Sequence, residues 1–152
     1  MAVAQILTEP LGNLATFARG TRALECVEIG SDDLARRIVR VETSLGSIGL
    51  RLEGERRLRD GDVVAANAHV VVALRVFADD VLVYRPRSLD EALAIAHALG
   101  NRHLPVQISE ATLVVRFDPL VEALFLEHGV AYTRERRVLE HPFRHAHAPH
   151  DG

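Results

Sequence analysis

The second half of the chain carries two helix patterns, each with its own start and stop signals. Ser88-Leu89-Asp90-Glu91 has the Ser-x-x-Glu spacing with which side chains satisfy the free amides of a helix start, and Gly100 stands where a left-handed residue ends a helix. Asp118-Pro119 supplies a cap and a proline at the first helical position, and Gly129 closes the second pattern. The sequence therefore predicts two helices, which end at Gly100 and Gly129.

Both predicted helices have apolar residues at helical spacing, and short strand-like runs surround them. In the first helix the apolar residues at helical spacing are Leu89, Ala92, Leu93, Ala96 and Leu99. We expect the second helix to bury Leu120, Val121, Leu124 and Phe125. The predicted strands are Val81–Tyr84, Val106–Ile108, Thr112–Phe117 and Val130–Arg134. The resulting order, β-α-β-β-α-β in about 60 residues, predicts a ferredoxin-like domain in which two helices cover one face of a four-stranded sheet.

The first half has a different pattern, in which glycine and charged residues separate short β-rich runs. These runs are Leu24–Ile29, Arg37–Thr43, Ser47–Leu52, Asp62–Ala65 and Val70–Phe77. The second and third alternate polar and apolar residues around a short turn, which predicts a half-buried hairpin. We therefore expect an α+β protein with a small all-β domain over residues 1–77, a ferredoxin-like domain over 78–138 and a flexible histidine-bearing tail over 139–152.

Charge, cysteine content and motifs exclude several classes of function. The 18 Lys and Arg residues against 21 Asp and Glu residues give a net charge of −3, which lacks the basicity of a nucleic-acid binder. The single cysteine, Cys26, allows no intramolecular disulfide and indicates a reducing compartment, so we expect a cytoplasmic protein. The start lacks the features of a secretory signal, and the uncharged run Val63–Leu74 is too short for a bilayer span of ~20 residues. No catalytic motif is present, so we do not expect an enzyme.

Histidine is concentrated at the end of the chain, where four of the eight occur within the last twelve residues. His145, His147 and His150 place three imidazoles within six residues, and neutral imidazoles can chelate Ni²⁺, Cu²⁺ or Zn²⁺. A solvated terminal segment without a ligand role is the equally weighted alternative. His141 precedes Pro142, which favours an extended backbone, and it is a reserve candidate.

His103 lies just beyond the predicted end of the first helix, in a loop position of the kind that often carries function. The simpler alternative is a histidine that only bonds the loop backbone. One imidazole cannot hold an ion tightly, but a two-fold axis between two copies would bring two His103 side chains together. Terminal histidines attached nearby would add ligands at an effective concentration that reaches about the mM range.

The segment Gly100-Asn101-Arg102-His103-Leu104-Pro105-Val106-Gln107-Ile108 resembles the hallmark segment of UreE, the family of urease accessory nickel metallochaperones. Leu113–Asp118, Gly129–Tyr132 and Pro142-Phe143 also resemble that family in order and spacing. The resemblance implies a homodimer joined through the ferredoxin-like domains, with His103 of both subunits on one nickel ion. It also implies added ligands from the terminal histidines, partner binding by the first domain, and transfer of nickel through the GTPase UreG to apo-urease.

One difference from the family concerns the start of the second predicted helix. Some members carry an extra histidine pair there, whereas this chain has Phe117-Asp118-Pro119, so we expect that auxiliary site to be absent and fewer ions to bind per dimer.

These observations together predict a non-enzymatic cytoplasmic nickel carrier whose metal ligands are His103, His145, His147 and His150. Because imidazole binds a metal only when neutral, we expect capture to weaken as the pH falls through the histidine range near ~6.5. Two alternatives stay open, a general zinc or copper buffer and an RNA-binding split βαβ module with an inert tail.

Overall fold

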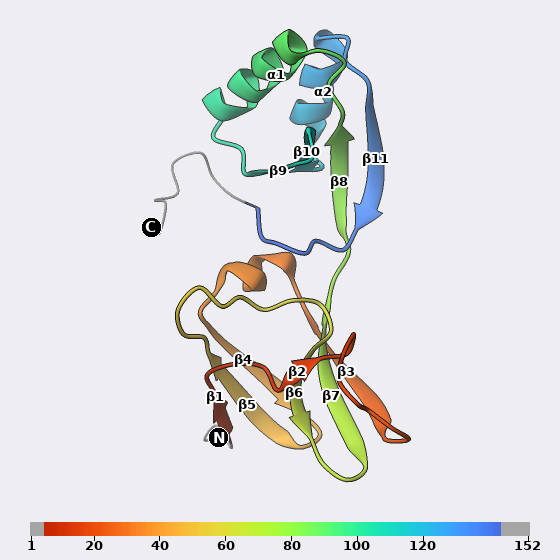
Figure 1. Ribbon diagram of the computed structural model, residues 1–152. Helices are drawn as coiled ribbons and strands as arrows, with labels where there is room; N and C mark the ends of the chain where they lie inside the picture. Colours follow the sequence, from red (N-terminus) through yellow and green to blue (C-terminus); the bar gives the residue numbers. More distant parts are fainter. Residues whose placement is uncertain (1–4, 144–152) are drawn as a thin grey trace. The chain divides into compact units, whose positions relative to one another are not determined.

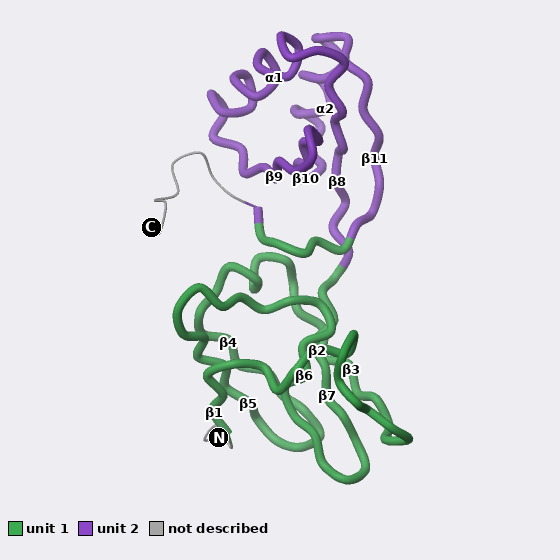
Figure 2. The backbone as a smooth tube through the Cα atoms, viewed as in Figure 1, with its two compact units in different colours: residues 1–77, 138–142 green, residues 78–137, 143–152 purple. Residues whose placement is uncertain are grey.

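The computed structural model describes residues 5–143, which form two compact units (Figure 2). The first unit runs to Phe77 and also includes residues 138–142, and the second runs from Ala78 to Arg137 and also includes Phe143. The first is built from strands and one short 3-10 helix, and the second from strands and two α-helices, so the predicted α+β class is confirmed. Within residues 5–143, no helix has the length and apolar character needed to span a bilayer.

The first unit contains seven strands in two sheets (Figure 1). One sheet has the order β1-β5-β4 and the other the order β2-β6-β7-β3. The strands are β1 (Gln5–Leu7), β2 (Gly12–Asn13), β3 (Ala23–Ile29), β4 (Ile38–Thr43), β5 (Gly46–Arg51), β6 (Asp62–Ala66) and β7 (Val70–Val76), and the 3-10 helix covers Ser31–Ala35.

Strands β4 and β5 form the predicted hairpin, with Thr43 paired to Gly46 across a two-residue turn. Alternate residues of β4 are buried, and Val39 and Leu50 pair directly on the core side. Such alternation puts one face of each strand against the core. Strand β3, in contrast, runs parallel to β7, a strand that is distant in the sequence. The core of this unit draws residues from both sheets, among them Ile29, Val41, Ile48, Val64 and Leu74.

The second unit has the predicted order β-α-β-β-α-β. Its elements are β8 (Asp79–Tyr84), α1 (Leu89–Asn101), β9 (Val106–Ser109), β10 (Thr112–Arg116), α2 (Pro119–Glu127) and β11 (Tyr132–Arg137). The strands form one antiparallel sheet in the order β11-β8-β10-β9. This order is the split βαβ arrangement.

Both helices pack on one face of this sheet (Figure 1), because alternate strand residues point toward them. The core on this side includes Leu82, Tyr84 and Val115 from the strands and Ile95 and Phe125 from the helices. The intervening strand residues Val81, Val83 and Val114 form a second apolar cluster, and the ring of Phe143 packs against it.

The structure corrects the predicted helix faces in two places. Leu120 was predicted to be buried with the apolar face of α2, but it is 70% exposed, while Val121, Leu124 and Phe125 are buried as expected. In α1 the buried residues are Ile95 and Leu99, whereas Leu89 and Leu93 are 73% and 61% exposed. A helix of 13 residues buries only one stripe, and the sheet contacts the stripe that contains Ile95.

The last strand begins later than expected. Val130 was predicted to start it, but β11 begins at Tyr132 because the amide of Val130 donates to the carbonyl of Phe125 and closes the end of α2.

Candidate metal site

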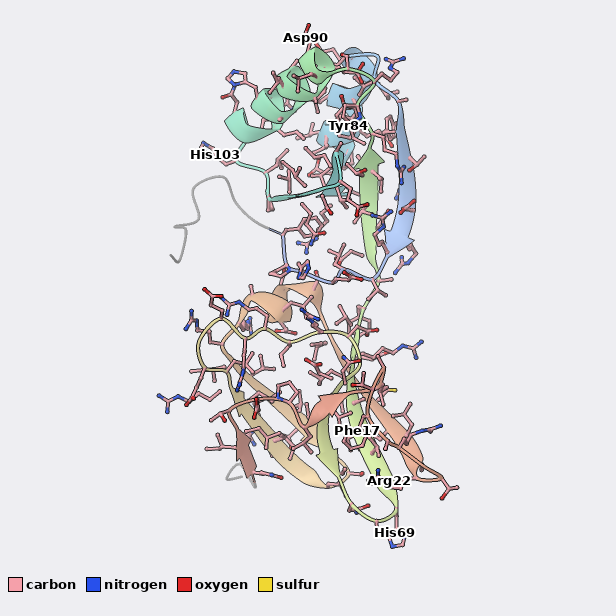
Figure 3. The ribbon with its side chains drawn as sticks, viewed as in Figure 1. Phe17, Arg22, His69, Tyr84, Asp90 and His103 are labelled. Carbon is pink, nitrogen blue, oxygen red and sulfur yellow. The ribbon has the colours of Figure 1, made fainter. Side chains whose placement is uncertain are left out.

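His103 is the first residue beyond the cap of α1. The predicted end at Gly100 is wrong, since α1 continues through Gly100 to Asn101 and Arg102 is its C-cap. The residue in the left-handed conformation is His103, with φ of 55°. Figure 3 shows His103 at this end of the helix, where the chain turns toward β9.

Two backbone hydrogen bonds hold this turn. The amide of His103 donates to the carbonyl of Gly100 over 3.0 Å, and the amide of Leu104 donates to the carbonyl of Leu99 over 3.4 Å. These bonds form the Schellman motif, in which the residue after the cap is left-handed. Leu104 packs against the core cluster that contains Leu99, which is the apolar contact that accompanies the motif. The position of the His103 backbone is therefore fixed by the helix and by the core.

Helix α2 ends in the same motif but with glycine in the left-handed position. Gly129 has φ of 65°, its amide donates to the carbonyl of Leu126, and the amide of Val130 donates to the carbonyl of Phe125. Left-handed backbone costs a residue with a β-carbon about 1–2 kcal/mol, although histidine occurs there more often than most residue types. His103 therefore occupies a position at which glycine is the more stable choice.

The side chain of His103 is exposed, so its imidazole is accessible to an ion. Within residues 5–143, no three His, Cys, Asp or Glu side chains come together as a metal site. An ion at His103 would therefore need ligands from a second chain or from the end of this one. A residue with a strained backbone, such as left-handed His103, is common at functional sites, where its side chain is kept for the function it performs.

The other predicted ligands lie in or near the end of the chain. His145, His147 and His150 lie outside the described residues. The reserve candidate His141 is exposed and belongs to the segment 138–142 of the first unit.

Three further described histidines, His69, His97 and His128, lie in ordinary structural positions. His97 lies one turn before the end of α1, with Nε2 3.2 Å from Nδ2 of Asn101. His128 is the C-cap of α2, and its amide donates to the carbonyl of Leu124. His69 lies in the loop between β6 and β7 (Figure 3).

The residues at the start of α2 have structural roles. Asp118 caps the helix by accepting a hydrogen bond from the amide of Leu120 at 2.7 Å. The ring of Phe117 lies 3.5 Å from the guanidinium carbon of Arg134, which forms a two-point ion pair with Asp80.

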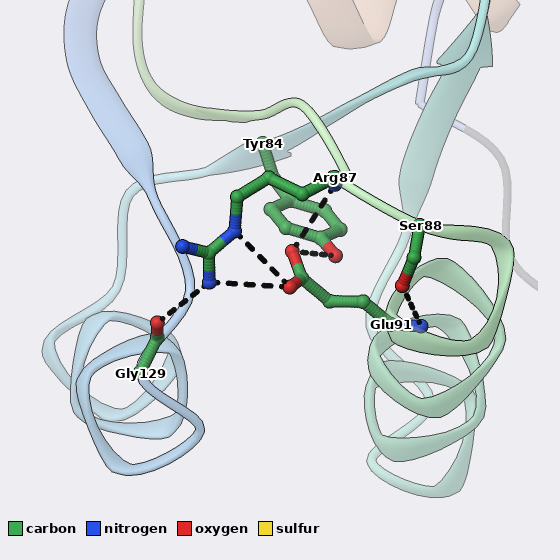
Figure 4. A network of polar contacts seen from close by, with 5 residues as sticks. All are labelled: Tyr84, Arg87, Ser88, Glu91 and Gly129. Atoms are coloured by element: carbon green, nitrogen blue, oxygen red, sulfur yellow. Dashed lines mark hydrogen bonds and ion pairs between the residues drawn. The ribbon is translucent and has the colours of Figure 1, made fainter.

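A polar network fixes the other end of α1 (Figure 4). Ser88 accepts a hydrogen bond from the amide of Glu91 at 3.1 Å, which confirms the predicted cap. The Glu91 carboxylate accepts a hydrogen bond from the Tyr84 hydroxyl at 2.9 Å and pairs with Arg87, which also donates to the carbonyl of Gly129. The network thus links β8, the start of α1 and the end of α2, at the end of α1 opposite to His103.

The same contacts shift two pKa values in opposite directions. Burial raises the pKa of Tyr84 to about 12, and its hydrogen bond to Glu91 adds to the increase. Burial acts to raise the pKa of Glu91 as well, but hydrogen bonds from Tyr84 and Arg87 and the Arg87 charge together lower it. Sequence reasoning missed this network, although a tyrosine at a strand end just before a capped helix was the available signal.

Comparison with known proteins gives the same result for both halves of the chain. The family model described as "UreE urease accessory protein, N-terminal domain" matches residues 7–76, and the model of the C-terminal domain matches residues 79–151. The urease accessory protein UreE of Geobacillus kaustophilus is 40% identical over 147 residues, which is 96% of this chain and 99% of that protein. UreE of Staphylococcus carnosus is 40% identical over 149 residues, again covering 96% of this chain and 99% of the relative. UreE of a Bacillus species is 39% identical over 135 residues, or 88% of this chain and 91% of the relative.

Both domain models and full-length relatives at this level of identity account for nearly the whole sequence. The chain therefore belongs to the UreE family of urease accessory proteins.

Proposed function

We propose that two copies of this chain hold one Ni²⁺ ion between their His103 side chains and deliver it for assembly of the urease active site. The observation that carries this proposal is an exposed histidine in a left-handed position, held by the Schellman turn of α1. Imidazole nitrogen suits Ni²⁺, and the backbone cost of a histidine at this position is explained if its side chain is needed.

The surface of α1 supports pairing of two copies through the second unit. Leu89 and Leu93 are exposed one turn apart, and the exposed Ala96 and the partly exposed Gly100 continue the same stripe toward the end at which His103 lies. A symmetric contact along this stripe would bury apolar surface and would bring the two copies of His103 to one axis.

The terminal histidines would then serve as additional ligands. His145, His147 and His150 are within seven residues of Phe143, the last described residue. Short tethers of this kind supply ligands at high effective concentration and still allow them to exchange, which suits a protein that transfers its ion.

Delivery requires partners, and we propose the GTPase UreG and the urease complex in the cytoplasm, with this chain acting as a carrier and not as an enzyme. Affinity alone will not separate this role from a zinc or copper buffer, because Cu²⁺ exceeds Ni²⁺ at nitrogen sites in general. Loss of urease activity in cells that lack the gene, restored by added nickel or by the gene, would support delivery.

Calorimetric titration with Ni²⁺ at neutral pH tests the central ligand. We expect His103→Ala to lose the tight binding step, and His128→Ala, which removes an exposed imidazole at the end of the other helix, to keep it. Unchanged tight binding by His103→Ala would exclude His103 from the site.

The mass in solution tests the pairing. We expect a dimer by light scattering, and a strictly monomeric protein that binds nickel tightly would contradict a shared site.

A further inference from the structure

The stretch of sequence around His103 carries an arginine and no carboxylate. No aspartate or glutamate occurs between Glu91 and Glu110, and Arg102 is the only arginine or lysine in that interval. Arg102 directly precedes His103, so the one fixed charge in this stretch is positive and stands beside the proposed ligand. Sites for many divalent cations gather carboxylates, so this composition is unusual for residues that bind a cation.

The structure fixes the backbone of Arg102 and leaves its side chain exposed. Arg102 is the C-cap of α1, and its amide donates to the carbonyl of Leu99 over 3.2 Å. The same turn holds His103. The Arg102 side chain has no hydrogen bond, ion pair or ring contact with any residue between 5 and 143.

Other arginines of the second unit have carboxylate partners. Arg87, Arg116 and Arg134 each lie within ion-pair distance of an aspartate or glutamate, and the guanidinium of Arg116 is also 4.9 Å from the centre of the Phe143 ring. No described carboxylate neutralises Arg102 in this way. Its charge is therefore available to act on an ion bound at the next residue.

A simpler role for Arg102 is to stabilise the helix. The carbonyl end of a helix favours a positive charge, and the last turn of α1 holds no other basic residue. This role predicts an effect on the free energy of unfolding and none on ion binding, so the two roles can be measured separately.

A positive charge beside the ligand repels all divalent ions to a similar extent. Ni²⁺ offsets this repulsion because it binds imidazole nitrogen well, whereas Mg²⁺ and Mn²⁺ prefer oxygen ligands and gain little from imidazole. A penalty that is equal for all ions therefore leaves only those that bind imidazole strongly, and it discriminates against the others.

We propose that Arg102 is a specificity-determining residue of the nickel site, whose unpaired charge keeps out divalent cations that prefer oxygen ligands and keeps bound Ni²⁺ exchangeable. This inference rests on the proposed function. It adds to that function a reason why the chain binds its ion without carboxylates near the central ligand in sequence.

The covalent chain sets a lower limit on the repulsion. Adjacent α-carbons are about 3.8 Å apart, so for any pair of rotamers the Arg102 guanidinium lies within about 17 Å of an ion on the His103 imidazole. At about 0.01 M salt the Debye length is about 30 Å, and the two arginines of a shared site then weaken Ni²⁺ binding at least about twofold. At about 1 M salt the Debye length is about 3 Å and the effect disappears.

Calorimetric titration of the full chain with Ni²⁺ at about pH 8, where an unperturbed imidazole is neutral, tests the charge. Arg102→Gln is expected to bind Ni²⁺ at least about twofold more tightly than the unmodified chain at about 0.01 M salt, and equally at about 1 M salt. Arg102→Lys keeps the charge and is expected to match the unmodified chain. Equal affinities at low salt, or a gain that persists at high salt, would overturn the inference.

Arg85→Gln is the matched control. Arg85 is exposed, has no partner among the described residues and lies beyond the other end of α1, a helix of 13 residues that is about 20 Å long. Because this charge is farther from His103, its removal is expected to change Ni²⁺ affinity less than Arg102→Gln does. Equal effects of the two substitutions would indicate a response to net charge alone and would overturn the inference.

Manganese tests the selectivity without nickel, because the electron paramagnetic resonance signal of aqueous Mn²⁺ falls when the ion binds. The unmodified chain is expected to leave this signal unchanged at equal concentrations of protein and Mn²⁺. Arg102→Glu places a carboxylate beside His103 and is expected to reduce the signal, whereas Arg85→Glu is expected to leave it unchanged. Uptake of Mn²⁺ by the unmodified chain, or no difference between the two glutamate variants, would overturn the inference.

These outcomes separate the inference from the proposed function. If the unmodified chain does not bind nickel, the proposed function fails and the inference fails with it. Tight nickel binding that does not respond to the charge at residue 102 overturns the inference alone. Lower stability of Arg102→Gln with unchanged binding of both metals would leave Arg102 as a helix-end cation only, which also overturns the inference.

Discussion

Substitution His103→Gly is expected to stabilise the metal-free protein and at the same time to abolish tight nickel binding. The reason lies in the Schellman turn of α1, where His103 has φ of 55° and Gly129 has φ of 65° at the equivalent place in α2. A glycine at position 103 would adopt this backbone without the steric cost of a β-carbon.

The magnitude follows from two opposing terms. Relief of left-handed strain contributes about 1–2 kcal/mol, and the greater freedom of glycine in the unfolded chain removes about 0.4–1 kcal/mol. At their mid-ranges, about 1.5 and about 0.7 kcal/mol, the two terms leave a net gain of about 0.8 kcal/mol, which for a chain of 152 residues raises the melting temperature by about 2–3 °C.

Denaturant unfolding in the presence of a chelator, followed by circular dichroism, measures this gain. Gly129→Ala supplies the mirror experiment, because no heavy atom lies within 4 Å of an added β-carbon there and any loss comes from the backbone. We expect Gly129→Ala to lose about 1 kcal/mol. A lower unfolding midpoint for His103→Gly would refute the assigned strain, and retained tight nickel binding by that variant would refute the ligand role of His103.

Three further predictions concern the second unit. Because the pKa of Tyr84 is raised from 10.0 to about 12, its neutral form stabilises the fold below pH 10, and this contribution is lost as the pH rises toward 12. Urea titrations should show a loss on the order of 2 kcal/mol over this range, and Tyr84→Phe should make the free energy of unfolding less dependent on pH. Ser88→Ala removes the cap of α1 and is expected to cost about 1 kcal/mol in the same titrations. Leu93→Glu should reduce the dimer fraction in light scattering and leave the melting temperature of the monomer unchanged, since Leu93 is 61% exposed.

Local signals predicted the second unit well because they act within a few residues. The caps at Ser88 and Asp118 and the left-handed Gly129 each rest on a hydrogen bond that the neighbouring residues determine. Gly100 was the exception, because glycine is tolerated inside a helix and His103 adopted the left-handed conformation instead.

Features that depend on distant residues could not be predicted. Periodicity identified α1 but not the stripe that contacts the sheet, and Leu120 was assigned to the core although only its neighbours are buried. The β-rich run Leu24–Ile29 indicates a strand but does not show that the partner of this strand is β7. Strands β1 and β2, of three and two residues, are too short to leave a pattern.

In the candidate site, too, features set by neighbouring residues could be predicted and features set by distant residues could not. A motif around His103 was readable in the sequence, whereas the geometry that gives this histidine its strained backbone was not. The contact between Phe143 and Arg116 joins residues 27 positions apart, and no local pattern indicates it.

The assignment of residues 138–142 to the first unit has a consequence for synthesis on the ribosome. Leu139 is only 2% exposed, and one of the two sheets of the first unit pairs β3 with β7 across 47 residues. Parallel pairing at such a separation is slow, and the final piece emerges after the entire second unit has been translated. We therefore expect the nascent amino-terminal unit to stay incomplete until translation is almost finished, and a gene fragment that stops at codon 77 to yield a product that aggregates.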